Sequence, residues 1–304
     1  MKLIAPDYYP QFRCIADKCR HSCCIGWEID IDRVTREKYR HVHGPFGERL
    51  NAAIDDGEVS SFRLGRDERC PMLTASGLCD LITVLGEDAL CQICADHPRF
   101  RNFFTDRTEI GLGLCCEEAA RLILTQQEPM HLIVLEEDGD EAPLPEEEAA
   151  LLALRDGLIA SLQDASQPIA HRLNALLAAV DFSIPDRNWV EVYRRLERLD
   201  PAWDCALDTL QQPLAAPPSS FETALASFTA YLLYRHLPGA LEDDDVPGRA
   251  AFCVLSTQVL AALCEAKPGC TIADLIEFAR MYSAEIEYSE DNIAALLDAL
   301  WEVE

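Results

Sequence analysis

The chain has 304 residues, 49% hydrophobic and 26% charged, which is typical of a globular protein with a buried core. Its 53 acidic and 26 basic residues give a net charge of −27, which argues against binding to nucleic-acid phosphates or anionic membranes. The sequence has no run of about 18 or more apolar residues, so no transmembrane helix is expected. Pro6 and Asp7 interrupt the N-terminal stretch before a signal-peptide core forms. We therefore expect a cytoplasmic protein without nucleic-acid or membrane partners.

The cysteines divide the sequence into two parts. Ten of the fourteen lie between residues 14 and 116, whereas Cys205, Cys253, Cys264 and Cys270 are scattered over the remainder and are interpreted as inert side chains. An acidic run with proline and glycine at 135–148 predicts a linker or exposed loop. We place the boundary near 140, with a cysteine-rich metal-binding domain at 1–140 and an α-helical domain at 141–304.

The first part has few long elements. A short helix through His41 can be capped by Asp32, and the glycines of Gly111-Leu112-Gly113 indicate a turn rather than a dinucleotide-binding loop. Further helices are expected at 86–97 and 117–127, and a short strand at 131–135. The cysteines fall between these pieces, where a metal centre can replace a small missing core.

The second part is predicted to be helical throughout. Apolar residues recur at helical spacing in four segments: Leu151 to Leu162, Ile169 to Val180, Trp189 to Leu199 and Phe221 to Leu232. Residues 249–265 are apolar nearly all round, as in a central helix. Thr271 with Asp274 resembles a capping box, and Ser289 can cap the last helix. The sequence thus predicts a mainly α protein, with an irregular cysteine-rich part followed by a helical bundle or array.

The cysteines of the first part form four groups: Cys14-x4-Cys19-x3-Cys23-Cys24, Cys70 with Cys79, Cys91-x2-Cys94, and Cys115-Cys116. In a reducing compartment such thiols are metal ligands or catalytic groups rather than disulfides. Thiolates select zinc or iron–sulfur clusters, which usually take four ligands, so ten thiols suffice for two sites or for one site with spectators. Histidine never falls at zinc-finger spacing, which favours an iron–sulfur cluster of the 4Fe–4S type, with zinc as the alternative. Fortuitous thiols or a redox dithiol remain further alternatives.

Four segments carry a resemblance to the flagellin lysine-N-methylase family. The first is residues 12–32, with the opening cysteine group followed by Gly26-Trp27-Glu28-Ile29-Asp30. The others are Cys70–Asp80, Leu90–Arg99 and Leu114–Arg121. In the last block Cys116 aligns with the family cysteine, whereas Cys115 and Glu117 stand where the family has serine and proline. A looser similarity lies in Tyr231–Tyr234 and Ile286–Ser289 of the helical half.

The resemblance implies an enzyme that transfers methyl groups from S-adenosylmethionine to lysine side chains of flagellin. It also gives the expected metal ligands: Cys14, Cys19, Cys23, Cys24, Cys70, Cys79, Cys94 and Cys116. Cys91 and Cys115 are the expected spectators. Trp27 is expected to cover the cluster. Arg99 is expected either to bind the carboxylate of the methyl donor or to form a helix-end salt bridge.

The catalytic residue stays unassigned at this stage. Four side chains that flank or follow the first cysteine group are candidate bases: Tyr8, Glu28, Asp30 and Asp32. The radical S-adenosylmethionine signature, Cys-x3-Cys-x2-Cys, is absent because Cys24 follows Cys23 directly. Two alternatives to a methyltransferase remain: a non-catalytic, metal-stabilised protein-binding module and an iron–sulfur redox protein.

Overall fold

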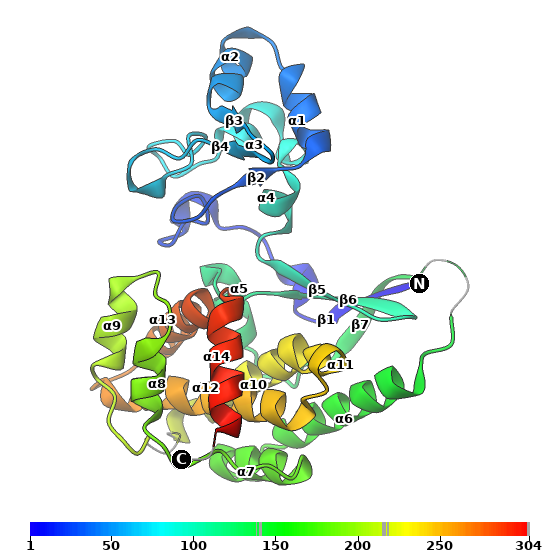
Figure 1. Cartoon of the computed structure of the whole chain (residues 1–304), viewed down its shortest axis with the longest axis vertical. Coiled ribbons are helices and arrows are strands. Elements are labelled where there is room, and N and C mark those ends of the chain that lie inside the picture. Colours follow the sequence, from blue (N-terminus) through cyan, green and yellow to red (C-terminus); the bar gives the residue numbers. More distant parts are fainter. Residues whose placement is uncertain (138, 140–141, 215–216, 218, 303–304) are drawn as a thin grey trace. The chain divides into compact units, whose positions relative to one another are not determined.

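The computed structural model describes every residue except 138, 140–141, 215–216, 218 and 303–304. The chain forms two compact units (Figure 1), a helical unit of Met1–Phe12 with Phe100–Glu304 and a cysteine-rich unit of Arg13–Arg99. This division differs from the boundary predicted near 140. The N-terminal strand β1 (Lys2–Pro6) pairs with β7 (Leu132–Glu137), so both segments belong with the helices. Residues 138 and 140–141 of the predicted linker lie outside the described residues.

A four-stranded sheet opens the helical unit. Its order is β5-β6-β1-β7, where β5 spans Arg99–Phe103 and β6 spans Arg107–Leu112. Strand β1 runs parallel to β6 and antiparallel to β7. The strand expected at 131–135 is therefore confirmed, but the turn expected around Gly111 is wrong because Gly111 lies within β6. A Cβ atom there would lie 2.3 Å from the Phe100 ring, which explains the glycine.

Helices make up the rest of this unit, so the prediction of a mainly α protein is confirmed for the described residues. They are α5 (Glu117–Leu124), α6 (Glu146–Leu162), α7 (Ile169–Ala179), α8 (Trp189–Arg195), α9 (Pro201–Leu207), α10 (Glu222–His236), α11 (Ala240–Asp243), α12 (Val246–Ala266), α13 (Ile272–Tyr282) and α14 (Glu290–Trp301). A π-helical segment, η7 (Ser283–Glu287), links α13 to the turn before α14. Short 3₁₀ turns lie at η1 (Tyr9–Gln11), η5 (Ser219–Phe221) and η6 (Leu237–Gly239).

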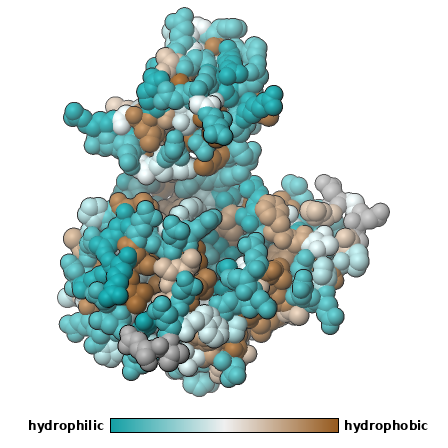
Figure 2. Space-filling model, viewed as in Figure 1, coloured by the Kyte–Doolittle hydropathy of each residue, from teal (hydrophilic) through white to brown (hydrophobic). Residues whose placement is uncertain are grey.

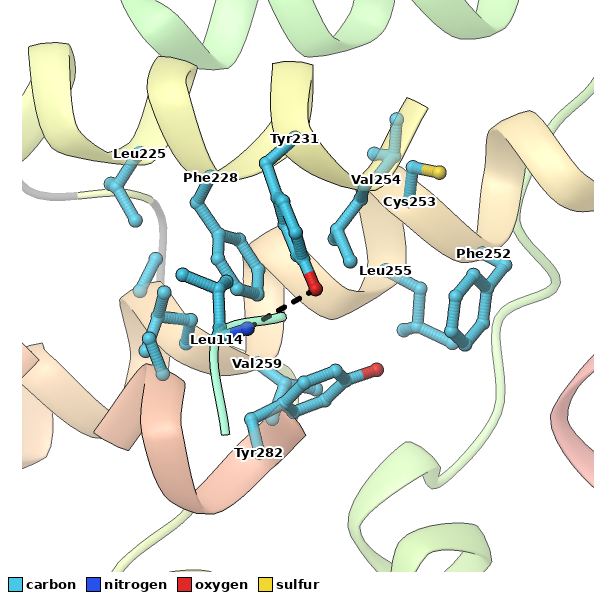
Figure 3. Packing of buried hydrophobic residues seen from close by; sticks show 14 of the residues in the cluster. Leu114, Leu225, Phe228, Tyr231, Phe252, Cys253, Val254, Leu255, Val259 and Tyr282 are labelled. Atoms are coloured by element: carbon cyan, nitrogen blue, oxygen red, sulfur yellow. Dashed lines mark hydrogen bonds between the residues drawn. The ribbon is translucent and has the colours of Figure 1, made fainter. Parts of the chain in front are cut away.

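Helix α12 is the core of the unit, as its apolar sequence predicts. Phe228 of α10 packs edge-on against Tyr282 of α13 at 5.9 Å between ring centroids, next to Val259 of α12 (Figure 3). By length and composition α12 is apolar enough to cross a membrane, but 78% of that apolar window is buried within the described fold. A helix that is hydrophobic all round and buried is what a globular core requires.

The predicted helix starts are confirmed where a side-chain cap exists. The hydroxyl of Thr271 accepts a hydrogen bond from Asp274 N, and the Asp274 carboxylate accepts one from Thr271 N, which completes the capping box of α13. Ser289 caps α14 in the same manner. The third predicted stripe is too long, however, because α8 ends at Arg195. The backbone N–H groups of Leu199 and Asp200 instead donate to the buried Glu285 carboxylate at 2.9 and 2.7 Å.

The cysteine-rich unit is built from short elements, as expected. They are η2 (Ala16–Lys18), β2 (Asp30–Ile31), α1 (Arg33–Arg40), α2 (Gly44–Ala52), β3 (Ile54–Asp56), β4 (Ser60–Phe62), η3 (Arg66–Glu68), α3 (Asp80–Leu85), η4 (Glu87–Ala89) and α4 (Gln92–Asp96). The strands form an antiparallel sheet in the order β2-β4-β3. The single helix predicted at 86–97 is wrong, because Leu90 and Cys91 are extended and α4 begins anew after them. On the face of the molecule shown in Figure 2, hydrophilic side chains predominate, in keeping with the net charge.

Candidate functional site

Five thiols share the core of the cysteine-rich unit. Cys70 and Cys91 are buried, and Cys24, Cys79 and Cys94 are half-buried against the same hydrophobic cluster. We call these five residues the thiol cluster. They come from three of the four sequence groups, so the fold brings together cysteines that are up to 70 positions apart.

Backbone pairing and helix starts position these thiols. Cys70 N donates to Cys24 O at 2.9 Å, which ties the first cysteine group to the second. A tight turn from Leu73 to Cys79 brings Cys79 back to the same core, with Gly77 at φ +82°, a conformation that favours glycine. Cys79 and Cys91 are the residues immediately before α3 and α4, respectively.

The carboxylate of Asp32 fixes the last of these positions. Its Oδ1 accepts from Thr35 N at 2.9 Å and caps α1, while its Oδ2 accepts from Gln92 N at 2.9 Å and holds the start of α4. Burial opposes ionisation of Asp32, but these backbone hydrogen bonds prevail and lower its pKa. Because both oxygens bind helix starts, Asp32 has a structural role here rather than that of the candidate base.

Cys91 and Cys94 form a hydrogen-bonded pair. The Cys94 thiol donates to the Cys91 sulfur, which lowers the pKa of Cys91. The same bond, together with burial, raises the pKa of Cys94. Cys91, expected to be a spectator, therefore lies in the thiol cluster beside a predicted ligand.

The other members of the thiol cluster differ in their ionisation. A hydrogen bond from the Cys23 thiol, aided by Ser22 and Arg69, lowers the pKa of Cys24 to about 7. Burial raises the pKa of Cys70 to about 12 and also raises that of Cys79. Neighbouring sulfurs contribute to the shifts of Cys70 and Cys94, so these groups interact electrostatically.

The donor chemistry of the thiol cluster fits a soft metal. Five sulfurs in one small core match the ligands that zinc and iron–sulfur clusters prefer. Over the described ranges, however, no three Cys, His, Asp or Glu side chains are already arranged to hold a metal ion. Zinc or iron–sulfur binding at these thiols therefore stays a prediction.

The remaining predicted ligands lie on adjoining loops or in the other unit. Cys14 is exposed and Cys19 half-buried on either side of η2, and the Cys19 thiol donates to His21 O at 3.2 Å. Cys23 is exposed, and its thiol forms a hydrogen bond with the sulfur of Cys24. Cys116 belongs to the helical unit, where it directly precedes α5. Its place among the ligands also stays a prediction.

Trp27 and Arg99 both lie near the C-terminal end of α4. Trp27 is half-buried against the core that contains the thiol cluster; its Nε1 donates to Cys23 O at 2.7 Å and its ring lies 6.2 Å from that of His97. The Arg99 guanidinium donates to Ala95 O at 3.1 Å, at the C-terminal end of α4. This contact places the Arg99 guanidinium at the helix end, and both expected roles of Arg99 stay predictions.

A buried polar network in the helical unit was not predicted from the sequence. Glu287, at the end of η7, has a fully buried side chain that accepts hydrogen bonds from Tyr231 Oη at 2.9 Å and His236 Nε2 at 2.7 Å. Arg235 donates to the Tyr231 hydroxyl at 2.8 Å. The same hydroxyl accepts from Leu114 N at 3.3 Å (Figure 3). These contacts join the two segments of the helical half in which the looser family similarity lies.

The network holds one ionised carboxylate inside the core. Burial opposes the charge on Glu287, but Arg235 and His236 outweigh it and hold the pKa of Glu287 at about 2. Burial also lowers the pKa of His236, so this imidazole is neutral at pH 7. Arg235 lies 5.0 Å from the centroid of the Phe100 ring and 4.7 Å from that of Tyr288. Two sequence signals lie in this network: the polar Tyr, Arg and His residues near the end of α10, and the looser family similarity of Tyr231–Tyr234 and Ile286–Ser289. Periodicity alone indicates only a helix there.

Comparisons with known proteins bear on what these features do. The chain is 25% identical over 234 residues to the lysine-N-methylase of Salmonella typhimurium, a match that covers 72% of this chain and 54% of that protein. The lysine-N-methylase of Salmonella choleraesuis matches over the same length with the same identity. The resemblance to the lysine-N-methylase family is confirmed. The chain is also 28% identical over 139 residues to the flagellar biosynthetic protein FliU of Salmonella muenchen, which covers 42% of this chain and 79% of that protein.

The similarity to the lysine-N-methylases extends beyond the cysteine-rich unit. A match of 234 residues is longer than the cysteine-rich unit, so it necessarily includes part of the helical unit. The chain spans about half the length of the lysine-N-methylases that it matches. No family model matches the chain, and no solved structure matches it.

Proposed function

We propose that this chain is a cytoplasmic, S-adenosylmethionine-dependent protein-lysine N-methyltransferase that acts on flagellin. The observation that carries the proposal is the similarity, over 72% of the chain, to two proteins named lysine-N-methylase. The flagellar name of the third relative supports flagellin as the substrate. A net charge of −27 further favours attraction of a lysine-bearing protein.

The proposed metal centre lies in the cysteine-rich unit. The thiol cluster would hold it, together with Cys14, Cys19 and Cys23 of the adjoining loops. The expected ligand Cys116 belongs to the helical unit, and its part in the centre stays a prediction. The soft donor set fits an iron–sulfur cluster, with 4Fe–4S favoured, or zinc. When bound, such a centre supplies structural stability or a binding place for the amino and carboxylate groups of the methyl donor.

The proposed reaction needs no radical. The lone pair of the lysine amine forms a bond to the methyl carbon while the bond from that carbon to the sulfonium sulfur breaks, so S-adenosylhomocysteine leaves. The amine must be neutral, and the site must therefore desolvate the lysine or take its proton. Trp27, packed on the core of the cysteine-rich unit, is suited to exclude water from the thiols. Arg99 is the proposed partner of the donor carboxylate, which a planar guanidinium can bind through two parallel hydrogen bonds.

The test combines metal analysis with an assay of the reaction. The intact protein is purified without oxygen, its iron, sulfide and zinc are measured, and it is incubated with unmodified flagellin and S-adenosylmethionine. We expect mass increases of one or more methyl groups on lysine peptides. An absorption band near ~400 nm would indicate iron–sulfur, because iron–thiolate ligation absorbs there and zinc does not.

Two variants with a matched control test the ligands. Cys19→Ser and Cys94→Ser should lose metal and soluble yield together, because metal binding and folding of a small site are coupled. Cys205→Ser, an exposed cysteine of α9, should retain both. Unchanged metal content in Cys19→Ser and Cys94→Ser would rule out the ligand assignment. A protein that carries its metal and binds the donor but leaves every flagellin lysine unmodified would favour the non-catalytic binding module.

A further inference from the structure

Two cysteines lie at the junction between α12 and α13. Cys264 is in the last turn of α12 and is buried, at 2% exposure. Cys270 is half-buried against the same hydrophobic core and stands two positions before the first residue of α13. Their sequence interpretation as inert side chains treats them separately, whereas the fold brings them together.

The turn between the two helices positions both thiols. Lys267 N donates to Cys264 O at 3.3 Å, and Cys270 N donates to Lys267 O at 3.1 Å, so the backbone folds back between the two cysteines. The Cys264 thiol forms a hydrogen bond with the Cys270 sulfur. The two sulfurs are therefore direct neighbours in the folded protein.

The hydrogen bonds give the two sulfurs different roles. Their contact favours the protonated form of Cys264 and the ionised form of Cys270, so Cys264 is the donor. Cys270 in turn donates to Thr271 O at 3.7 Å. Burial raises the pKa of both thiols above the ordinary value, so both carry protons at pH 7. Cys270 is the more accessible of the two and accepts the proton of its neighbour.

Other contacts hold the junction in place on both sides of the turn. The Asp274 carboxylate accepts from Lys267 Nζ at 2.7 Å and from Thr271 N at 2.8 Å. Lys267 Nζ also lies 5.8 Å from the centroid of the Phe278 ring. A disulfide requires two cysteines whose backbones already bring the sulfurs close. Two hydrogen-bonded sulfurs on a fixed turn meet that requirement.

We propose that Cys264 and Cys270 form a reversible disulfide when the protein meets a disulfide oxidant such as oxidised glutathione. The Cys270 sulfur, as a thiolate, bonds to one glutathione sulfur, and the S–S bond of the oxidant breaks to release the first glutathione. The Cys264 sulfur then bonds to the Cys270 sulfur and displaces the second glutathione. The two thiol protons and two electrons of the protein end on the two reduced glutathione molecules.

This modification site is independent of the proposed methyl transfer. It lies in the helical unit, whereas the thiol cluster belongs to the cysteine-rich unit. The bridge links the end of α12 to the residue before the Thr271 cap of α13, so it fixes the junction in the oxidised state. In the proposed cytoplasmic location glutathione keeps thiols reduced, so the bridge forms under oxidative conditions and opens again afterwards.

Peptide mapping of the intact protein tests the bridge. The protein is purified without oxygen and exposed to mixtures of reduced and oxidised glutathione; its free thiols are then alkylated and the chain is cleaved after glutamate. Cleavage at Glu265 separates Cys264 from Cys270, so the disulfide appears as two linked peptides. We expect the linked pair under excess oxidised glutathione and its loss under excess reduced glutathione. Cys253, buried in α12, should stay alkylated in both.

Variants and urea unfolding complete the test. Cys270→Ser should give no linked pair, whereas Cys205→Ser, an exposed cysteine of α9, should give as much as the parent. The oxidised parent should withstand more urea than the reduced parent, because a cross-link restricts the unfolded chain, and Cys270→Ser should show no such difference.

Three results would overturn the proposal. One is a folded parent that gives no linked pair under excess oxidised glutathione, including one that links these peptides only in urea. The second is a linked pair joined through Cys253 instead of Cys264. The third is an oxidised parent that withstands less urea than the reduced parent, since the native turn would then not accommodate the bridge.

Discussion

Glu287 offers the sharpest test of how the helical unit is stabilised. Its ionised carboxylate is fully buried and is shared by Tyr231, Arg235 and His236. Replacement by glutamine keeps the size of the side chain but removes the charge that faces Arg235. Removing one partner of a buried ion pair typically costs about 3–5 kcal/mol, because the other charge is left uncompensated. We expect Glu287→Gln to lose about this much of the free energy of unfolding.

The pKa of Glu287 gives an independent measure of the same interaction. Lowering a pKa from 4.5 to about 2 corresponds to about 3 kcal/mol in favour of the charged form in the folded protein. Because the folded-state pKa is depressed, this stability is present above pH 4.5 and is lost as the pH falls toward 2. The neighbouring His236 also has a lowered pKa, and its protonation in the unfolded chain adds to the loss of stability below pH 6.5.

The assay is urea unfolding of the intact chain, followed by tryptophan fluorescence at pH 7 and at pH 3.5. The stability difference between the parent and Glu287→Gln should shrink by about 1 kcal/mol at the lower pH, as the parent protonates Glu287 on unfolding. Glu285→Gln is the control, since Glu285 lies on the same π-helical segment but burial raises its pKa. The difference in the free energy of unfolding between the parent and Glu285→Gln should grow as the pH falls, because a group with a raised pKa takes up its proton more readily in the folded protein. A loss below about 1 kcal/mol for Glu287→Gln, or a difference independent of pH, would refute the reasoning.

Two further predictions concern other buried or capping carboxylates. Asp32→Ala should destabilise the cysteine-rich unit by about 2 kcal/mol in thermal unfolding, because it removes caps worth about 1 kcal/mol each from α1 and α4. Asp32→Asn keeps one acceptor oxygen and should lose less in the same measurement. Glu109→Gln should cost about 3–5 kcal/mol in urea unfolding, since Arg155 is buried and donates to Glu109 Oε1 at 3.0 Å. The exposed variant Glu290→Gln is the control for the latter and should stay within about 0.5 kcal/mol of the parent.

Local sequence determined most of the helical half. The spacing of apolar residues fixes one buried stripe for α6 and α7, and the all-round apolar character of α12 fixes its central place. Helix α10 is buried on nearly every side, which is more than its predicted stripe. The caps of α1, α13 and α14 also follow from single residues, since a side chain within three positions supplies the missing hydrogen bond. The grouping of the cysteines, and the family similarity that they carry, are likewise local in sequence.

Only the tertiary structure decided how distant segments combine. Strand β1 joins the helical unit because its partners β6 and β7 follow more than 100 residues later, and short strands carry too little pattern to predict that pairing. Cys91 lies in the thiol cluster because Asp32, about 60 positions earlier, holds the start of α4. Glu287 is ionised because α10 brings Arg235 and His236 to it. Such contacts depend on which surfaces pack in three dimensions, and the spacing of residues along the chain does not contain that information.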